Sequence, residues 1–144
     1  MIGGLAVNHW ANEPMATADV DLVIATDRLD TCLEAFSASG FTAANFEGSV
    51  NLKGRSTVSI QISTEDFYHT YPERAVPADV HGILMRVASL EDTLQGKLKA
   101  WAEPGWRPSK RQKDLTDIFR LLDAHPHLHP LQPEAILARL DEST

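Results

Sequence analysis

The 144-residue sequence predicts a single α+β domain, with a mixed β-sheet flanked by helices and a helical C-terminal part. Three observations support this fold class. Helical and strand patterns alternate up to residue 88, whereas only helical patterns follow it. The content of 43% hydrophobic and 23% charged residues is ordinary for a globular domain that needs no disulfide or metal to fold. No repeat or long linker divides the chain. We therefore expect one domain over residues 1–144, with a sheet-containing core at 1–88 and C-terminal helices at 89–144.

The first part of the chain predicts two short helices on either side of a strand. Gly3 and Gly4 precede a helical spacing of apolar residues over 5–11. Residues 19–25 alternate as a strand whose second half is apolar on both faces, which favours a central, covered position in the sheet. Residues 28–39 place their apolar side chains on one helical stripe, as expected for a helix that packs on a core.

A meander of short strands is expected next. The candidate strands are 41–46, 49–53 and 57–63, with a glycine in each intervening turn. Residues 64–81 are polar and contain two prolines, which predicts a long surface loop. Residues 82–88 then form one more candidate strand.

The remaining residues predict a group of helices. Ser89 and Asp92 match a capping box that begins the first of them, which carries its apolar residues up to Trp101 on one face. Prolines break the chain, and a second helix is expected from Ser109. A proline-spaced connector and a last helix over 134–141 complete the pattern.

Charge and cysteine content exclude several classes of protein. The formal net charge is −7, which argues against a non-specific nucleic-acid coat protein, yet residues 97–113 carry six cations and one acid. The single cysteine, Cys32, excludes a disulfide framework and a cysteine-based zinc site, and it fits a reducing compartment. No apolar run is long enough to cross a membrane, and the start lacks the pattern of a signal peptide. We therefore expect a cytoplasmic protein.

The first candidate functional motif is Asp19-Val20-Asp21. Residues two apart on a strand share a face, so both carboxylates point the same way. Two such carboxylates repel each other unless a cation lies between them, and Mg²⁺ prefers oxygen ligands of this kind. The alternative is an exposed strand end with two solvated acids.

Two further motifs would suit a phosphate-bearing ligand. Gly3-Gly4 before a helix allows close backbone approach to a phosphate, although a simple tight turn would use the same residues. In the basic stretch, Lys97 borders an apolar helix face, and Lys110 and Lys113 lie four residues before Asp114 and Asp117 respectively, the spacing of helical ion pairs. This stretch is either a solvated helix face with weak ion pairs or a basic wall facing a polyanion such as a nucleoside triphosphate or an RNA end.

The order of these motifs resembles a known family. Gly3-Gly4, a helix and then Thr17-Ala-Asp19-Val-Asp21-Leu-Val-Ile resemble the opening signature of the nucleotidyltransferase superfamily. The segments 87–100 and 110–118, with Lys97 and the spacing Lys110-x-x-x-Asp114-x-x-Asp117, are similar to its AbiEii/AbiGii toxin-like branch. The resemblance spans residues 2–122.

The resemblance implies a minimal nucleotidyltransferase fold that transfers a nucleoside monophosphate to an RNA or protein hydroxyl, with pyrophosphate leaving. By position, Asp19 and Asp21 would hold Mg²⁺, and Gly3 and Gly4 would contact the triphosphate. Lys97, with Lys110 of the basic wall, would steady the nucleotide, and Asp114 would position a substrate group or a lysine. A toxin of this kind would have an antitoxin protein as partner.

One departure from the family pattern supports an alternative function. Active members usually carry a third carboxylate on a later strand, and the strand that matches it here, Val58–Ser63, has Gln61 in that place. An amide is a poor metal bridge or base. The alternative is therefore a catalytically degenerate nucleotidyltransferase-fold binding module. Glu65 and Asp66 lie just beyond the strand and are candidates to compensate. The chain also begins directly at the glycines, where relatives have a helix, and a second copy could cover the apolar surface left there.

Overall fold

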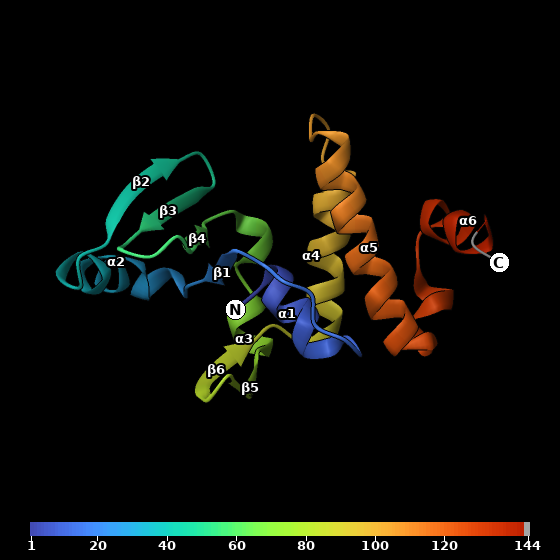
Figure 1. Ribbon diagram of the computed structural model, residues 1–144, viewed down its shortest axis with the longest axis horizontal. Helices are drawn as coiled ribbons and strands as arrows, with labels where there is room; N and C mark the ends of the chain where they lie inside the picture. The colour runs from blue at the N-terminus through green and yellow to red at the C-terminus, as the bar shows by residue number, and fades with distance from the viewer. Residues whose placement is uncertain (143–144) are drawn as a thin grey trace.

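A four-stranded mixed sheet organises the fold in the computed structural model, which describes residues 1–142 (Figure 1). The last two residues of the predicted domain lie outside this described part. The strands are β1 (Asp19–Val23), β2 (Thr42–Phe46), β3 (Ser49–Lys53) and β4 (Ser59–Ser63), in the order β1-β4-β3-β2. β1 runs parallel to β4, and the other pairs are antiparallel. The predicted mixed sheet and meander are both confirmed.

The central position predicted for β1 is wrong, because β1 lies at the end of the sheet. Its outer edge is covered by the start of the chain, where the N–H of Ile2 donates to the carbonyl of Asp21 at 2.8 Å. Leu22 packs in two apolar clusters at once. The apolar residues of β1 therefore reflect cover on its faces, and not a strand on each side.

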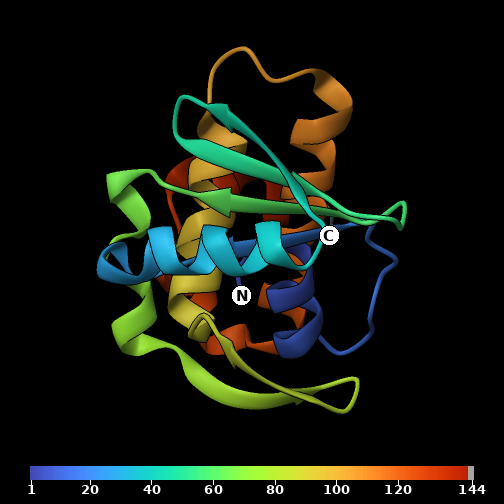
Figure 2. The same ribbon diagram turned by 90° about the vertical axis from the view of Figure 1, so that its left-hand side faces the viewer.

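One face of the sheet is covered by α2 (Leu29–Ala38), which follows the 3₁₀ turn η1 (Thr26–Arg28). Figure 2 shows α2 in front of the sheet, with the C-terminal helices behind it. The side chains of Leu33 and Phe36 pack against a cluster that includes Leu52 and Ile62, which are almost fully buried. This packing leaves the other sheet face free.

The predicted loop over 64–81 is wrong. The segment forms η2 (Asp66–Tyr68), the short helix α3 (Tyr71–Arg74) and β5 (Val76–Val80), which pairs with β6 (Ile83–Val87) in a separate hairpin. The prolines misled the prediction, since Pro72 lies in the first turn of α3, where a missing N–H is harmless. The hairpin turn is His81-Gly82 with positive φ at both residues, as its right-handed twist requires.

The helices form the second half of the fold. α1 (Gly3–Trp10) packs on β1 and on the two long helices α4 (Leu90–Ala102) and α5 (Pro108–Ala124), and η3 (Pro126–Leu131) and α6 (Glu134–Glu142) follow. The Ser89 hydroxyl accepts the N–H of Asp92 at 3.1 Å, so the predicted N-cap is confirmed. The Asp92 carboxylate does not complete a capping box, because Arg74 binds it through two nitrogens. Within residues 1–142, no helix has the length and apolar character needed to cross a bilayer.

Candidate active site

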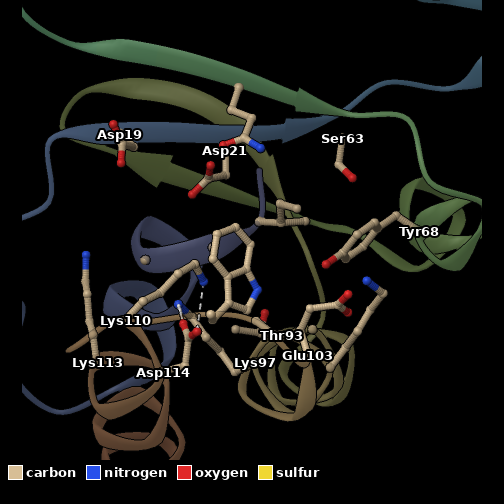
Figure 3. A pocket seen from close by; sticks show the side chains of 18 of the residues that line it. Asp19, Asp21, Ser63, Tyr68, Thr93, Lys97, Glu103, Lys110, Lys113 and Asp114 are labelled. Atoms are coloured by element: carbon tan, nitrogen blue, oxygen red, sulfur yellow. Dashed lines mark hydrogen bonds and ion pairs between the residues drawn. The ribbon is translucent and has the colours of Figure 1, made fainter. Parts of the chain in front are cut away.

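A cleft of about 630 Å³ lies between the free face of the sheet and helices α4 and α5. Figure 3 shows carboxylates from the sheet on one wall and lysines from the two helices on the other. The cleft brings together the residues that the family resemblance marks as metal, nucleotide-binding or catalytic candidates. Its lining includes Gly3, Gly4, Asp19, Asp21, Gln61, Lys97, Lys110 and Asp114.

Strand alternation explains why the carboxylates face this cleft. On β4, Ile60 and Ile62 pack toward α2, so the intervening Gln61 and the following Ser63 point to the opposite face. On β1, Asp19 and Asp21 share that opposite face and line the cleft. The register pairs Asp21 directly with Gln61. The residue expected in place of the third carboxylate therefore does lie beside the carboxylate pair.

Asp21 lies in a setting that disfavours its negative charge. Burial raises the pKa of Asp21, and the neighbouring Asp19 carboxylate raises it further. The charges of Lys97, Lys113 and Lys110 act in the opposite direction without reversing the shift. A positive charge placed close to the two carboxylates would therefore stabilise their ionised form.

Gly3 is required next to Asp21 for steric reasons. Its φ is +70°, and a Cβ there would lie 2.9 Å from the Asp21 Cβ and would overlap the carboxylate. Gly4 is less constrained, because a Cβ would lie 3.4 Å from the nearest atom, the Thr17 hydroxyl. The absence of side chains leaves the first backbone N–H groups of α1 beside the carboxylates, where a phosphate would meet them.

The lysines on the opposite wall are held by buried carboxylates. The Lys97 ammonium lies 3.1 Å from Asp114 and 2.9 Å from Asp117, and Lys110 lies 3.0 Å from the other Asp114 oxygen. Burial lowers the pKa of Lys97, but Asp117 and Asp114 outweigh it and leave the pKa above its ordinary value. The Asp114 carboxylate therefore holds two lysine side chains at once.

The alternative of a solvated helix face is wrong for this part of α5. Asp114 and Asp117 are each only 3% exposed. The expected Lys110–Asp114 pair forms, but Lys113 does not pair with Asp117, which binds Lys97 and, at 2.9 Å, Arg120. Lys113 is exposed, and among the described residues it makes no ion pair.

Sequence reasoning missed the other end of the cleft. Tyr68 and Tyr71 line it, together with Thr93, Gly96 and Lys99 of α4. Both tyrosines come from the segment that the sequence predicts to be a loop. The one sign of their importance was a group of aromatic residues within an otherwise polar stretch.

The two carboxylates suggested to replace the missing third one are not equivalent. Glu65 lines the cleft, but its carboxylate lies 2.6 Å from the Lys99 ammonium, whereas Asp66 lines a separate small pocket at the C-terminal ends of β1 and β4. Within residues 1–142, no three histidine, cysteine or acidic side chains are close enough to hold a metal by themselves. Asp19 and Asp21 fit Mg²⁺ that arrives with phosphate oxygens, since Mg²⁺ is commonly held by one or two carboxylates plus substrate phosphates and water.

The comparisons with known proteins agree with the fold described above. The sequence matches the family described as "Nucleotidyl transferase AbiEii toxin, Type IV TA system" over residues 1–144. No curated protein sequence matches the chain significantly.

Several solved structures share the fold. The antibiotic-resistance factor ANT(2'')-Ia is 15% identical, with a TM-score of 0.59 over 99% of this chain and 80% of that chain. An antigenic nucleotidyltransferase-like protein from Paracoccidioides brasiliensis is 24% identical, with a TM-score of 0.57 over 99% of this chain and 78% of that chain. The lincomycin-bound lincosamide antibiotic adenylyltransferase LnuA is 11% identical, with a TM-score of 0.56 over 83% of this chain and 84% of that chain. At these identities the similarity shows the predicted nucleotidyltransferase fold and no more.

Proposed function

The chain belongs to the AbiEii family of nucleotidyl transferase toxins, and from that premise we propose that it binds a nucleoside triphosphate with Mg²⁺ in the cleft. We propose that it transfers the nucleoside monophosphate to a hydroxyl group of an RNA or a protein in the cytoplasm. The family is one of toxin–antitoxin systems, so the proposal includes an antitoxin protein as partner.

One observation carries the proposal. Asp19 and Asp21 project from one strand face into the cleft that Gly3, Lys97 and Lys110 also line. Within residues 1–142 neither carboxylate forms an ion pair, and the glycine leaves the start of α1 free of side chains beside them. A magnesium-bound polyphosphate satisfies both needs at once.

In the proposed reaction, the oxygen of the acceptor hydroxyl bonds to the α-phosphorus of the nucleotide. The bond between that phosphorus and the oxygen bridging to the β-phosphate breaks, pyrophosphate leaves, and the hydroxyl proton passes to water. Bound Mg²⁺ would neutralise phosphate charge and polarise a phosphoryl oxygen. The chain's own contribution is positioning: Asp19 and Asp21 orient the polyphosphate, and Lys110 and Lys113 face it from α5.

A catalytically degenerate binding module is the second candidate, and the register of β1 and β4 favours it. Gln61 lies directly opposite Asp21, where its amide cannot accept a proton. On this second proposal the cleft binds the nucleotide without transferring it, because the carboxylate that would complete the site is missing. The two candidates therefore differ in turnover and not in ligand.

Nucleotide binding is the first test. Isothermal titration of each nucleoside triphosphate, with and without Mg²⁺, should show binding to the wild type only in the presence of the metal. Asp19→Asn with Asp21→Asn should abolish it. The matched control is Asp30→Asn with Asp123→Asn, which removes the same charge from two exposed positions outside the cleft. No binding by the wild type, or equal binding by both double variants, would refute the proposal.

Transfer is the second test. Incubation with an α-labelled nucleoside triphosphate and total RNA or protein should transfer label to a macromolecule and release pyrophosphate. Binding without any release would instead support the degenerate module. In that case Gln61→Asp, which restores a carboxylate opposite Asp21, should raise pyrophosphate release above the wild-type level.

A further inference from the structure

The two ends of the cleft differ in chemistry. At one end lie Asp19, Asp21, Lys110 and Lys113, which are charged groups suited to metal and phosphate (Figure 3). At the other end, Tyr68 presents an aromatic side chain, and the nearby Lys99 charge is neutralised by Glu65 at 2.6 Å. Lys99 also lies over the Tyr68 ring, at 5.7 Å from its centroid, and the Glu103 carboxylate adds negative charge near the ring. An elongated ligand with an anionic end for the lysine side and an aromatic end that carries no negative charge fits this polarity.

The aromatic end contains a hydrogen-bonding group without a partner. Tyr71 is 5% exposed, and its buried hydroxyl makes no hydrogen bond within residues 1–142. The polar side chains around it are engaged elsewhere, since Asp92 binds Arg74 and the Thr93 hydroxyl donates to the Ala88 carbonyl. Among the buried side-chain atoms of the described residues that lack a partner, this hydroxyl is the one that belongs to the cleft wall.

The space beside this hydroxyl is kept open by Gly96 of α4. A Cβ at that position would lie 3.8 Å from the Tyr71 hydroxyl and 3.7 Å from the Tyr68 ring. Gly96 occupies the middle of a 13-residue helix, where glycine costs about 1 kcal/mol relative to alanine. The glycine therefore leaves a methyl-sized gap between two rings that meet edge to face, with centroids 5.1 Å apart.

We propose that the Tyr68–Tyr71–Gly96 end of the cleft is a nucleobase subsite, in which a planar heterocycle stacks on Tyr68 and hydrogen-bonds to the Tyr71 hydroxyl. The hydroxyl has no contact with solvent, so a neighbouring side chain has to move for the base to reach it. Burial raises the pKa of Tyr68 to about 12 and raises that of Tyr71 as well, so both phenols stay neutral at physiological pH. A neutral phenol donates to a ring nitrogen or carbonyl oxygen of a base and does not attract phosphate. This inference rests on the proposed function, because it adds the base to a site already proposed for the triphosphate.

The test separates the base from the polyphosphate. Inorganic tripolyphosphate with Mg²⁺ and each nucleoside triphosphate with Mg²⁺ are titrated into the wild type, Tyr71→Phe and Gly96→Ala. We expect both variants to weaken nucleotide binding, by about 2- to 10-fold for the lost hydrogen bond of Tyr71→Phe, and to leave tripolyphosphate binding unchanged. Gln95→Ala is the matched control for Gly96→Ala, since Gln95 is exposed on the same helix and lies outside the cleft.

A short single-stranded oligonucleotide, titrated in parallel, identifies the source of the base. Losses confined to the nucleoside triphosphates assign the base to the nucleotide donor, whereas losses confined to the oligonucleotide assign it to an RNA acceptor. Unchanged binding of both ligands by both variants overturns the inference. If the wild type binds neither tripolyphosphate nor nucleotide, the proposed function fails instead. Unfolding curves keep the result interpretable, because Tyr71→Phe removes an unsatisfied hydroxyl and should not lower stability.

Discussion

We expect Lys97 to contribute more to the stability of the fold than to ligand binding, and Lys97→Met tests this. The side chain of Lys97 is 12% exposed, and those of Asp114 and Asp117 are each 4% exposed. Its removal would leave two buried carboxylates with one cation fewer between them. Asp114 would keep Lys110, and Asp117 would keep Arg120.

The expected magnitude follows from this arrangement. Removing one partner from a buried ion pair costs about 3–5 kcal/mol, and the two remaining cations place Lys97→Met at the lower end. With a urea dependence of roughly 2 kcal/mol per molar, a loss of about 3 kcal/mol lowers the unfolding midpoint by about 1.5 M. Because the carboxylates hold the pKa of Lys97 above 10.5, the difference from wild type should persist up to that pH and shrink as the pH rises through the folded-state value.

The assay is urea unfolding followed by tryptophan fluorescence and circular dichroism. Lys113→Met is the matched control, because it removes the same charge from an exposed position of α5 that takes part in none of the described ion pairs. It should cost less than about 0.5 kcal/mol. The double variant Asp114→Asn with Lys97→Met should lose less free energy of unfolding than the two single variants lose in sum, since the two groups share one network of ion pairs. A midpoint for Lys97→Met equal to that of Lys113→Met would refute the reasoning.

Three other predictions concern the same cleft. Burial and Asp19 raise the pKa of Asp21, so the free energy of unfolding falls as the pH rises from 3.8 through the raised folded-state pKa. At pH 7, without metal or nucleotide, Asp21→Asn should therefore have a higher urea midpoint than the wild type. A lower midpoint would contradict this. Gly3→Ala should lower the free energy of unfolding more than Gly40→Ala, because both glycines have positive φ but only Gly3 is in contact with Asp21. Equal losses of stability on urea unfolding would show that this contact is unimportant. The only two tyrosines, Tyr68 and Tyr71, both have raised pKa values. Tyrosinate absorbance of the native protein should therefore be almost absent at pH 10, where the urea-unfolded chain is half ionised.

Local pattern was sufficient to predict the sheet wall of the site. The period of two places Asp19 and Asp21 on one face. This relation depends on strand geometry alone and not on which layers cover the sheet, so the error about the central position of β1 left it intact. The position of Gln61 beside Asp21 was expected from the family resemblance, because strand alternation does not fix the register between two strands.

Features that depend on distant parts of the chain could not be predicted. The partner of Asp117 is decided by how α4 packs on α5, which brings Lys97 closer than the Lys113 expected from helical spacing. Tyr71 reaches the cleft because α3 docks against α4, where Arg74 and Asp92 join the two helices. Prolines in that segment have the same local appearance in a loop as in the first turn of a helix.

The structure also changes what the basic stretch can do for a polyanion. Lys97 and Lys110 are both held by Asp114, and Lys99 is held by Glu65, so these lysines carry less free charge than the sequence count implies. Lys113 and Arg107 remain exposed, and among the described residues neither makes an ion pair, while the carboxylates of Asp19 and Asp21 lie on the opposite wall. A bare triphosphate would be repelled by these two carboxylates. On the proposed function, the cation that the nucleotide brings to the two aspartates removes this repulsion, which is why nucleotide binding is expected to depend on Mg²⁺.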